Sequence, residues 1–311
     1  MSEKRNTDII EFTPVTPDIK QLYLSFLSGE TQRGCEFTFA NLCLWGQQNY
    51  AVVKDHFLLF SKFSSRTIYP YPLGKGDKKA VLDLIIADAK AKGIPCCISG
   101  LGTKAKQTLE ELYPGRFTFR YDDGSFDFVY DINDLADLNG KKYHAKRNHL
   151  NRFREAYPDY RVEHIDESNL PKVKQMAQEW YASRLEENPD SDFNMEQTAL
   201  DRAFRSYDSL GFEGLMLING GDILAFTMAS RLSEDTFDVH FEKARPDIQG
   251  AYAAINCELA RYIRDKYPEV KFLDREEDMG IEGLRKAKQS YYPHHQVEKC
   301  FAWLSEEKDG N

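Results

Sequence analysis

The stretch Thr236–Leu273, TFDVHFEKARPDIQGAYAAINCELARYIRDKYPEVKFL, decides the fold. It begins with a strand pattern over Thr236–Glu242, in which aromatic or β-branched residues alternate with polar ones. A helical pattern headed by Gly250 then runs to Lys266, and a second apolar strand follows at Val270–Leu273. A strand, a helix and a strand in this order predict a βαβ unit, with two parallel strands and a helix that covers one face.

The segment before this unit has the pattern of an antiparallel hairpin. Strand patterns at Gly214–Ile218 and Ile223–Arg231 flank Asn219-Gly220-Gly221-Asp222, and Asn and Gly tolerate the positive φ angles of tight hairpin turns. Antiparallel hairpins that lead into a βαβ unit predict a mixed, mainly antiparallel sheet with helices on both faces. Further elements are predicted at Tyr160–Ile165, Leu170–Leu185, Met195–Tyr207, Gly283–Tyr291 and Val297–Leu304.

The first half of the chain repeats this order of elements more loosely. Its helices and strands are predicted at Ile19–Ser28, Ala51–Val53, Phe57–Lys62, Thr67–Tyr71, Lys79–Lys92, Ile94–Ser99, Lys104–Tyr113, Phe117–Tyr121 and Phe126–Asp131. The repeat predicts an α/β (α+β) fold of two tandem domains with one architecture. We expect a first domain over residues 1–138, a basic linker helix over 139–158, and a second domain over 159–311 that carries the active site.

A basic segment, Gly140–Arg154, lies between the two halves. It carries six cations and two histidines without one acidic residue, on a chain whose formal net charge is −9. Helical spacing places an apolar stripe on one face, made of Tyr143, Leu150, Phe153 and Tyr157. One interpretation is a helix docked by this stripe with solvated charges around it. The other is a surface for a polyanion, with Lys146, Arg147 and Arg154 on the phosphates of an acyl donor.

An acidic run follows the strand that ends at Leu273. Four acids stand within five residues, namely Asp274, Glu276, Glu277 and Asp278, and a short helix with three cations comes next. Carboxylates at the C-terminal end of a strand in an α/β protein usually line the ligand crevice. The alternative is that the acids are solvated, that Asp278 caps the next helix, and that Arg285 and Lys288 pair with the acids to fix the turn.

We expect Glu242, Asp238 and His240 to share one face of their strand and to form an acidic pocket with this run. Such a pocket suits a cationic amine, and crowded carboxylates raise one another's pKa, which would leave one of them as a base. The predicted catalytic residues are Glu242, Glu276, Glu277 and Asp278. The predicted substrate-binding residues are His240, Asp274, Arg285 and Lys288. No metal site is expected, because the chain has neither a calcium-loop pattern nor an HExxH motif.

Composition excludes several classes of protein. The negative net charge argues against a protein that coats nucleic acid along its whole surface. The six cysteines show no CxxC spacing, which is typical of reduced thiols in a cytoplasmic protein. No stretch approaches the roughly 18 consecutive apolar residues of a membrane span, so a soluble protein is expected.

Three segments resemble an uncharacterised bacterial family that shares the C-terminal domain of phosphatidylglycerol lysyltransferase. They are Gly140–Arg154 (GKKYHAKRNHLNRFR), His240–Ala244 (HFEKA) with Gly250–Ala254, and Arg275–Lys288 (REEDMGIEGLRKAK). The layout is also similar to Fem-type aminoacyltransferases and to the tandem fold of GCN5-related N-acyltransferases (GNAT). The resemblance implies two tandem GNAT-like domains, with a cleft where Thr236–Glu242 separates from Val270–Leu273.

The resemblance also implies a function. It indicates an aminoacyl- or acyl-transferase that moves an activated acyl group onto an amine or hydroxyl, with aminoacyl-tRNA as a candidate donor. In N-acyltransferases the loop after the first strand binds donor pyrophosphate, which implies donor-binding roles for Gln249 and Gly250. This loop has a single glycine, and its Asp247 disfavours phosphate.

Two other functions stay open. One is a CoA-dependent N-acetyltransferase, and the other is a non-catalytic binding module for a cationic metabolite or peptide. The expected partners are tRNA or CoA as donor and a small amine, a lipid headgroup or a peptide as acceptor. No cofactor is implied apart from the donor itself, aminoacyl-tRNA or acyl-CoA.

Overall fold

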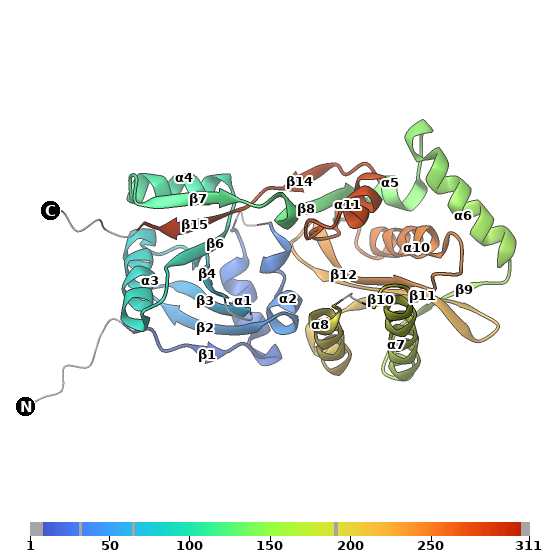
Figure 1. The fold of residues 1–311 in the computed structure, drawn as a ribbon, viewed down its shortest axis with the longest axis horizontal. Helices are drawn as coiled ribbons and strands as arrows, with labels where there is room; N and C mark the ends of the chain where they lie inside the picture. Colours follow the sequence, from blue (N-terminus) through green and yellow to red (C-terminus); the bar gives the residue numbers. More distant parts are fainter. Residues whose placement is uncertain (1–8, 31–32, 64–65, 190–191, 306–311) are drawn as a thin grey trace, which may run out of the picture. The chain divides into compact units, whose positions relative to one another are not determined.

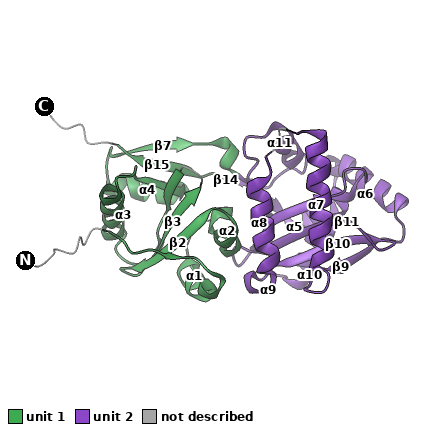
Figure 2. Cartoon of the chain, turned by 60° about the horizontal axis from the view of Figure 1, so that its bottom comes forward, with its two compact units in different colours: residues 1–126, 297–311 green, residues 127–296 purple. Residues whose placement is uncertain are grey.

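The computed structural model describes residues 9–30, 33–63, 66–189 and 192–305. The chain forms two compact units (Figures 1 and 2): unit 1 contains residues 1–126 and 297–311, and unit 2 contains residues 127–296. Each unit has one mixed sheet with mainly antiparallel strands, as the sequence predicts. None of the helices within the described ranges combines the length and the apolar character that a membrane span requires.

Unit 1 is built on a sheet with the strand order β1-β2-β3-β4-β6-β15-β7, in which β5 lies beside β3 and only β4 and β6 are parallel. Its strands are β1 (Thr13–Pro14), β2 (Gln47–Val53), β3 (His56–Phe63), β4 (Arg66–Pro70), β5 (Leu73–Gly74), β6 (Cys97–Leu101), β7 (Phe117–Tyr121) and β15 (Cys300–Leu304). Its α-helices are α1 (Lys20–Leu27), α2 (Phe39–Leu44), α3 (Lys78–Lys92) and α4 (Thr103–Leu112). The sequence predicted these elements apart from the short β1, β5 and α2.

Local chemistry sets the ends of α3 in unit 1. The Asp77 carboxylate accepts a hydrogen bond from the Ala80 N–H at 3.1 Å and thereby caps the first turn. Gly93 ends the helix with a left-handed conformation, φ 64°, which glycine adopts without steric cost. These two residues explain why the predicted helix begins and ends where it does.

Unit 2 has the strand order β14-β8-β13-β12-β11-β10-β9. β12 and β13 are parallel, whereas β13 with β8 and the neighbouring pairs from β12 to β9 are antiparallel. Its strands are β8 (Asp127–Asp131), β9 (Arg161–His164), β10 (Glu213–Asn219), β11 (Asp222–Arg231), β12 (Thr236–Ala244), β13 (Phe272–Asp274) and β14 (His295–Val297). Its α-helices are α5 (Ile132–Asp137), α6 (His144–Ala156), α7 (Leu170–Glu187), α8 (Asn194–Arg205), α9 (Tyr207–Leu210), α10 (Ala251–Lys266) and α11 (Glu282–Gln289). The predicted βαβ unit is β12, α10 and β13.

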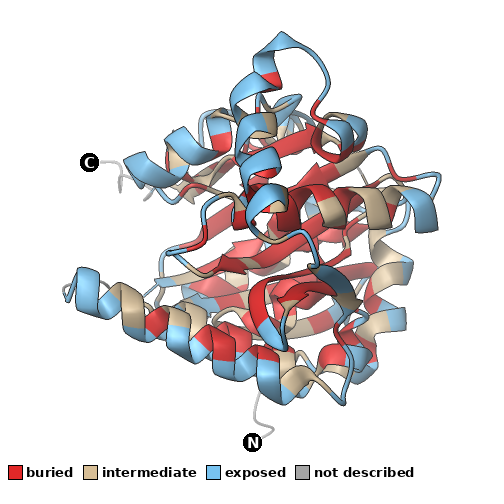
Figure 3. Ribbon diagram, turned by 90° about the vertical axis from the view of Figure 1, so that its right-hand side faces the viewer, coloured by how far each residue is buried: buried red, intermediate tan, exposed pale blue. Residues whose placement is uncertain are grey.

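The sheet of unit 2 lies between two layers of helices. Helix α10 packs on one face against β10, β11 and β12 and also contacts α5 and α6, whereas α7 contacts β11 and β12. Figure 3 shows buried strands in the middle of this unit and exposed outer surfaces on the helices around them. The main buried cluster joins α10, α6 and the sheet. Hydrophobic burial on this face therefore fixes the orientation of the strands that carry the site.

The basic segment is an integral part of unit 2. Three residues of its predicted apolar stripe, Tyr143, Leu150 and Phe153, are buried in the main cluster, and Tyr157 packs against it. The docked-helix interpretation therefore describes the apolar face of α6. The segment predicted as a basic linker helix over 139–158 lies within residues 127–296, where this face packs against the main buried cluster.

The division into units differs from the predicted boundaries at two strands. β8 precedes the basic segment in sequence but pairs with β13 in unit 2. The predicted strand Val297–Leu304 is interrupted: β14 joins the sheet of unit 2, and β15 lies between β6 and β7 in unit 1. Local patterns predict that a segment is extended, but the backbone hydrogen bonds of a strand do not specify its partner. We call this arrangement the strand exchange.

Candidate active site

The strands β12 and β13 separate after three residue pairs. The last pair is Asp238 with Asp274, and β12 then continues alone on this side to Ala244. The segment after β13 follows β8 instead, because the Arg275 N–H donates to the Phe128 carbonyl at 2.9 Å. The strand separation that the family resemblance implies therefore exists within unit 2, and the acidic run follows it in sequence.

A β-bulge at His240 decides which side chains share a face of the sheet. Met228 and Ala229 are neighbours on β11, whereas their partners on β12 are Phe241 and Val239. His240 is therefore an extra residue in β12, and the alternation of side chains shifts by one position after it.

The bulge shows that one prediction was wrong. Uninterrupted alternation would place Asp238, His240 and Glu242 on one face, but Glu242 lies opposite Thr227 on the face covered by α10. Asp238 lies opposite Ser230 on the other face, and His240 points to the same side. The predicted acidic pocket is consequently divided between the two faces of the sheet.

On the α10 face, Glu242 forms a largely buried ion pair with Arg275. The Arg275 Nη2 donates to Glu242 Oε1 at 2.8 Å, and Asn256 Nδ2 donates to Glu242 Oε2 at 3.3 Å. The Arg275 guanidinium also lies 5.0 Å from the ring centroid of Tyr291 and 5.7 Å from that of Tyr130. Aromatic faces and one carboxylate thus hold this cation in a partly desolvated place.

Lys146 joins this cluster from the basic helix α6. Its Nζ lies 3.8 Å from the ring centroid of Tyr291. Burial, and next the positive charge of Arg275, lower the pKa of Lys146 to about 8, although Glu242 acts in the opposite direction. A lysine with such a pKa exists in both protonation states near neutral pH, so it can accept or donate a proton there.

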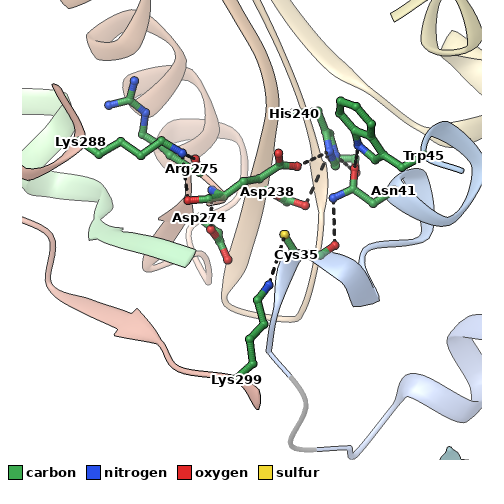
Figure 4. A network of polar contacts seen from close by, with 11 residues as sticks. Cys35, Asn41, Trp45, Asp238, His240, Asp274, Arg275, Lys288 and Lys299 are labelled. Atoms are coloured by element: carbon green, nitrogen blue, oxygen red, sulfur yellow. Dashed lines mark hydrogen bonds and ion pairs between the residues drawn. The ribbon is translucent and has the colours of Figure 1, made fainter. Parts of the chain in front are cut away.

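On the opposite face, His240 is held between a hydroxyl and two carboxylates. Its Nε2 lies 2.8 Å from Ser230 Oγ, and its Nδ1 lies 3.2 Å from Glu276 Oε1 and 3.6 Å from Asp238 Oδ2. In Figure 4 the Arg275 guanidinium points away from His240 and Asp238. His240 and Glu242, predicted to act in one pocket, therefore belong to separate clusters.

The acidic run mostly makes contacts that fix its own fold. Asp274 Oδ1 accepts the Glu276 N–H at 2.8 Å, and Asp278 Oδ1 accepts the Gly280 N–H at 2.9 Å. Asp278 also binds Arg285 through Nε at 2.5 Å and Nη2 at 3.1 Å. The Arg285 guanidinium lowers the pKa of the Asp278 carboxyl below its ordinary value. This ion pair agrees with the alternative given above, in which Arg285 pairs with the acidic run to fix the turn.

Asp278 does not cap α11. The N-cap position belongs to Ile281, which makes no side-chain capping bond, and Asp278 closes the turn before it. The predicted helix start was placed correctly, but the acid was assigned the wrong local role because its partner Arg285 lies seven residues away.

Lys288 binds three consecutive backbone carbonyls of the acidic run. Its Nζ donates to the carbonyls of Arg275, Glu276 (3.0 Å) and Glu277 (2.5 Å). Burial, followed by the nearby Arg275, lowers the pKa of Lys288. Lys288 therefore stabilises the backbone conformation of residues 275–277. Glu277 takes part in this contact through its backbone carbonyl.

Two other cations of the basic helix bind groups of unit 2. Arg147 Nη1 donates to the carbonyls of Leu138 and Gly140, the latter at 2.6 Å, and Arg154 lies 3.5 Å from a carboxylate oxygen of Glu258. Of the three cations predicted to bind donor phosphates, Lys146 is the one that reaches the Arg275–Glu242 pair.

Gly250 has a packing role at the start of α10. Its φ is 85°, and a Cβ atom at this position would lie 2.2 Å from the carbonyl oxygen of His149 on α6. Close approach of the two helices thus requires glycine here. Gln249 is exposed beside it. Their predicted donor-binding role stays a prediction.

Five residues of these clusters were absent from the predicted set, namely Arg275, Ser230, Asn256, Tyr130 and Tyr291. Arg275 stands as a cation among four acids, and Tyr291 is one of two adjacent tyrosines before Pro293, which indicates helix-end packing or a pocket lining. Ser230, Asn256 and Tyr130 carry no comparable signal. Their roles depend on strand register and on the path of α10, which local patterns do not define.

The fold of this chain is shared by known structures. A conserved protein of unknown function from Bacteroides thetaiotaomicron VPI-5482 is 37% identical, with a TM-score of 0.90 over 96% of this chain and 100% of that one. L-PGS from Bacillus licheniformis is 16% identical, with a TM-score of 0.65 over 92% and 91%. A tandem GNAT protein from the clavulanic acid biosynthesis pathway is 8% identical, with a TM-score of 0.50 over 96% and 99%.

The last two likenesses concern the fold, and they confirm the predicted tandem GNAT-like architecture. A search of curated proteins gave no significant match. The family described as phosphatidylglycerol lysyltransferase, C-terminal, matches residues 29–302, as the sequence resemblance predicted. This chain belongs to that family.

Proposed function

We propose that unit 2 carries an acyltransferase active site that moves an activated acyl group from a donor such as aminoacyl-tRNA to an amine or hydroxyl acceptor. One observation carries the proposal: Lys146, with a pKa of about 8, lies against Tyr291 beside the Arg275–Glu242 pair, where β12 and β13 separate. Membership in a family named for a lysyltransferase supports the reaction class.

In this proposal Lys146 is the general base. An acceptor amine or hydroxyl must lose a proton as it attacks, and a base whose pKa lies near the working pH is best suited to take it. Unperturbed lysine has a pKa of about 10.4 and is almost fully protonated at neutral pH. Burial and the positive charge of Arg275 lower the pKa of Lys146, so a larger fraction of this lysine is unprotonated near neutral pH.

Arg275 supplies the positive charge for the reacting carbonyl. Its Nη2 is bound to Glu242, while its buried Nη1 has no hydrogen-bond partner among the described residues. A fixed N–H donor in a partly desolvated place can stabilise the oxyanion that develops during acyl transfer. Glu242 then positions Arg275 and compensates its charge, in place of the base role predicted from the sequence.

The chemical step is balanced without any further reactant. The acceptor oxygen or nitrogen forms a bond to the donor carbonyl carbon, and the ester bond of aminoacyl-tRNA breaks. The acceptor proton passes to Lys146 and then to the departing ribose oxygen. With acyl-CoA the leaving group is a thiolate, and the same base returns the proton to sulfur.

Transfer assays with two labelled donors test the proposal. The purified protein is incubated with tRNA charged with radiolabelled amino acids, or with radiolabelled acetyl-CoA. Each donor is offered phosphatidylglycerol vesicles, a small amine and an amine-bearing peptide as acceptors. Transfer from aminoacyl-tRNA that Lys146→Met abolishes and Lys141→Met preserves is the expected result, because Lys141 is an exposed cation of the same segment.

The other outcomes are equally informative. Transfer from acetyl-CoA alone would replace the donor and favour the N-acetyltransferase. Absence of transfer from both donors, with a folded protein that binds a cationic peptide, would favour a non-catalytic binding module. Equal activity of parent and Lys146→Met would remove Lys146 from the reaction.

A further inference from the structure

The face of the sheet opposite Lys146 carries a cluster of metal-ligating atoms. Asp238 and His240 project from β12, and Glu276 projects from the segment after β13. One ligand atom from each residue lies within 4.8 Å of the other two. The three residues are separated by up to 38 positions in sequence, so no local motif announces them.

Two of the three spacings between these atoms fit a tetrahedral metal ion. Zinc takes imidazole nitrogen and carboxylate oxygen ligands at about 2.0–2.1 Å, which makes the ligand atoms of a tetrahedral site about 3.3 Å apart. His240 Nδ1 lies 3.2 Å from Glu276 Oε1 and 3.6 Å from Asp238 Oδ2. The two distances bracket the value expected for a tetrahedron.

The imidazole of His240 is oriented for coordination by its other nitrogen. Nε2 lies 2.8 Å from Ser230 Oγ, and Ser230 is the cross-strand partner of Asp238. In protein metal sites a hydrogen bond at one ring nitrogen commonly fixes the ring so that the other nitrogen faces the ion. The bulge that turns His240 toward this face thus also aims Nδ1 at the two carboxylates.

The backbone conformation of Glu276 is unusual. Its φ is 57°, in the left-handed region that a residue with a side chain seldom adopts. The Glu276 N–H donates to Asp274 at 2.8 Å and its carbonyl accepts from Lys288 at 3.0 Å, so both backbone polar groups of this residue are held. Such backbone conformations cluster at functional positions, and from this one the Glu276 carboxylate lies 3.2 Å from His240 Nδ1.

Exposure suggests where the ion would remain accessible. The side chains of Asp238 and His240 have no exposed surface, whereas 19% of the Glu276 side chain is exposed. Two ligands are therefore enclosed, and the third lies at the opening. Three protein ligands leave a fourth position for water or another oxygen ligand.

We propose that Asp238, His240 and Glu276 bind one divalent first-row transition-metal ion such as Zn²⁺, which ties the acidic run to β12. The donor set of one imidazole and two carboxylates suits these ions better than Mg²⁺, which prefers oxygen ligands and octahedral geometry. The site lies on the other face of the sheet from Lys146 and is independent of the proposed acyl transfer.

Metal binding to the full chain tests the proposal. The purified protein is stripped with a chelator, and Zn²⁺ binding is measured by calorimetry and by elemental analysis after dialysis. Co²⁺ serves as a spectroscopic probe of tetrahedral coordination, and Mg²⁺ serves as the negative control. We expect one Zn²⁺ per chain, a higher melting temperature with Zn²⁺, and visible absorption with Co²⁺.

Matched variants assign the ion to this site. Glu276→Gln and His240→Gln should abolish stoichiometric binding, and Glu276→Gln is the variant expected to keep the fold because its side chain is the most exposed of the three. Ser230→Ala should weaken binding by about 10–100-fold, as expected for loss of an orienting partner. The double variant His294→Gln/His295→Gln should bind normally, because these adjacent exposed histidines form no part of the cluster.

Two results would overturn the proposal. Absence of Zn²⁺ binding by the folded, stripped parent would show that His240 is held by hydrogen bonds and charge alone. Binding that survives in folded Glu276→Gln but disappears in the His294→Gln/His295→Gln variant would place the ion on the surface histidines instead.

Discussion

Arg275 and Glu242 form an ion pair of 2.8 Å at the point where β12 and β13 have separated. Arg275 follows β13, and Glu242 follows the bulge in β12. The pair therefore connects the two chain segments after their strands have separated. Both side chains are largely shielded from solvent. Removal of one partner would leave the other charge poorly compensated, which makes this pair the most sensitive link in the site.

Glu242→Gln is therefore expected to destabilise unit 2, by up to about 3–5 kcal/mol if the pair behaves as fully buried ones do. Urea unfolding of Glu242→Gln, Arg275→Met and the double variant measures the coupling. A coupling energy within about 0.5–3 kcal/mol is expected for residues in contact. Strict additivity of the two single effects would contradict a direct interaction.

Lys146 governs the predicted pH dependence of transfer. A general base must be unprotonated, so the rate of the parent should rise with pH and level off above about 8. Lys146→Met should lower the rate by about 10²–10⁴-fold, the usual effect of losing a general base. The measurement is the initial rate of transfer from pH 6 to 9 with Lys141→Met as the control. A parent profile that is flat across this range would argue against the assignment.

Lys146 should also make the free energy of unfolding depend on pH. Its folded pKa of about 8 lies below its ordinary value of 10.5, so between these pH values the unfolded chain binds more protons. The free energy of unfolding contributed by Lys146 should consequently rise with pH in this window. Chemical unfolding of parent and Lys146→Met at several pH values would reveal a flatter profile in the variant.

Lys288→Met should loosen residues 275–277, because it removes one donor from three carbonyls. We expect a lower melting temperature and faster hydrogen exchange at the Glu276 and Gly280 amides. Lys286→Met is a matched control, since Lys286 is an exposed residue paired with the exposed Glu282. Similar behaviour of the two variants would show that Lys288 has no special role in the loop.

Asp278→Asn should act on stability more than on chemistry. It removes the charge that binds Arg285, at an expected loss of about 1.5–3 kcal/mol for a charged hydrogen bond. The lowered pKa of Asp278 means that its contribution is fully present above the ordinary aspartate value and is lost as pH falls through the folded pKa. The parent should lose this increment below about pH 4, whereas Asp278→Asn should not. Unchanged stability at neutral pH, with turnover reduced in folded molecules, would instead restore the catalytic role predicted from the sequence.

Sequence patterns predicted most of the helices and strands because apolar periodicity and turn chemistry are local properties. The βαβ unit around Thr236–Leu273 and the helix predicted at Lys79–Lys92 are examples. The site was predicted less completely. A single bulge at His240 moved Glu242 to the other face, and no local signal distinguishes an extra residue in a strand from a regular one. The contact of Lys146 with Tyr291 likewise depends on tertiary packing.

The strand exchange predicts which fragment can fold by itself. Residues 127–296 contain the whole second sheet except Val297, the last residue of β14, whereas residues 159–311 lack β8 and α6 with its buried Phe153. We expect cooperative unfolding of the first fragment by circular dichroism and none of the second. Comparable cooperativity of the two fragments would contradict the importance of β8.

The strand exchange also bears on the order in which a ribosome delivers the parts of this protein. Domains usually fold in the order of their synthesis, with the N-terminal one first. Here β15 occupies a place between β6 and β7, so the sheet that begins at β1 lacks an internal member until residues 300–304 have been translated. Residues 127–296 can complete their own sheet before that moment. Unit 2 should therefore complete its fold before unit 1, because the sheet of unit 1 is incomplete until β15 has been synthesised.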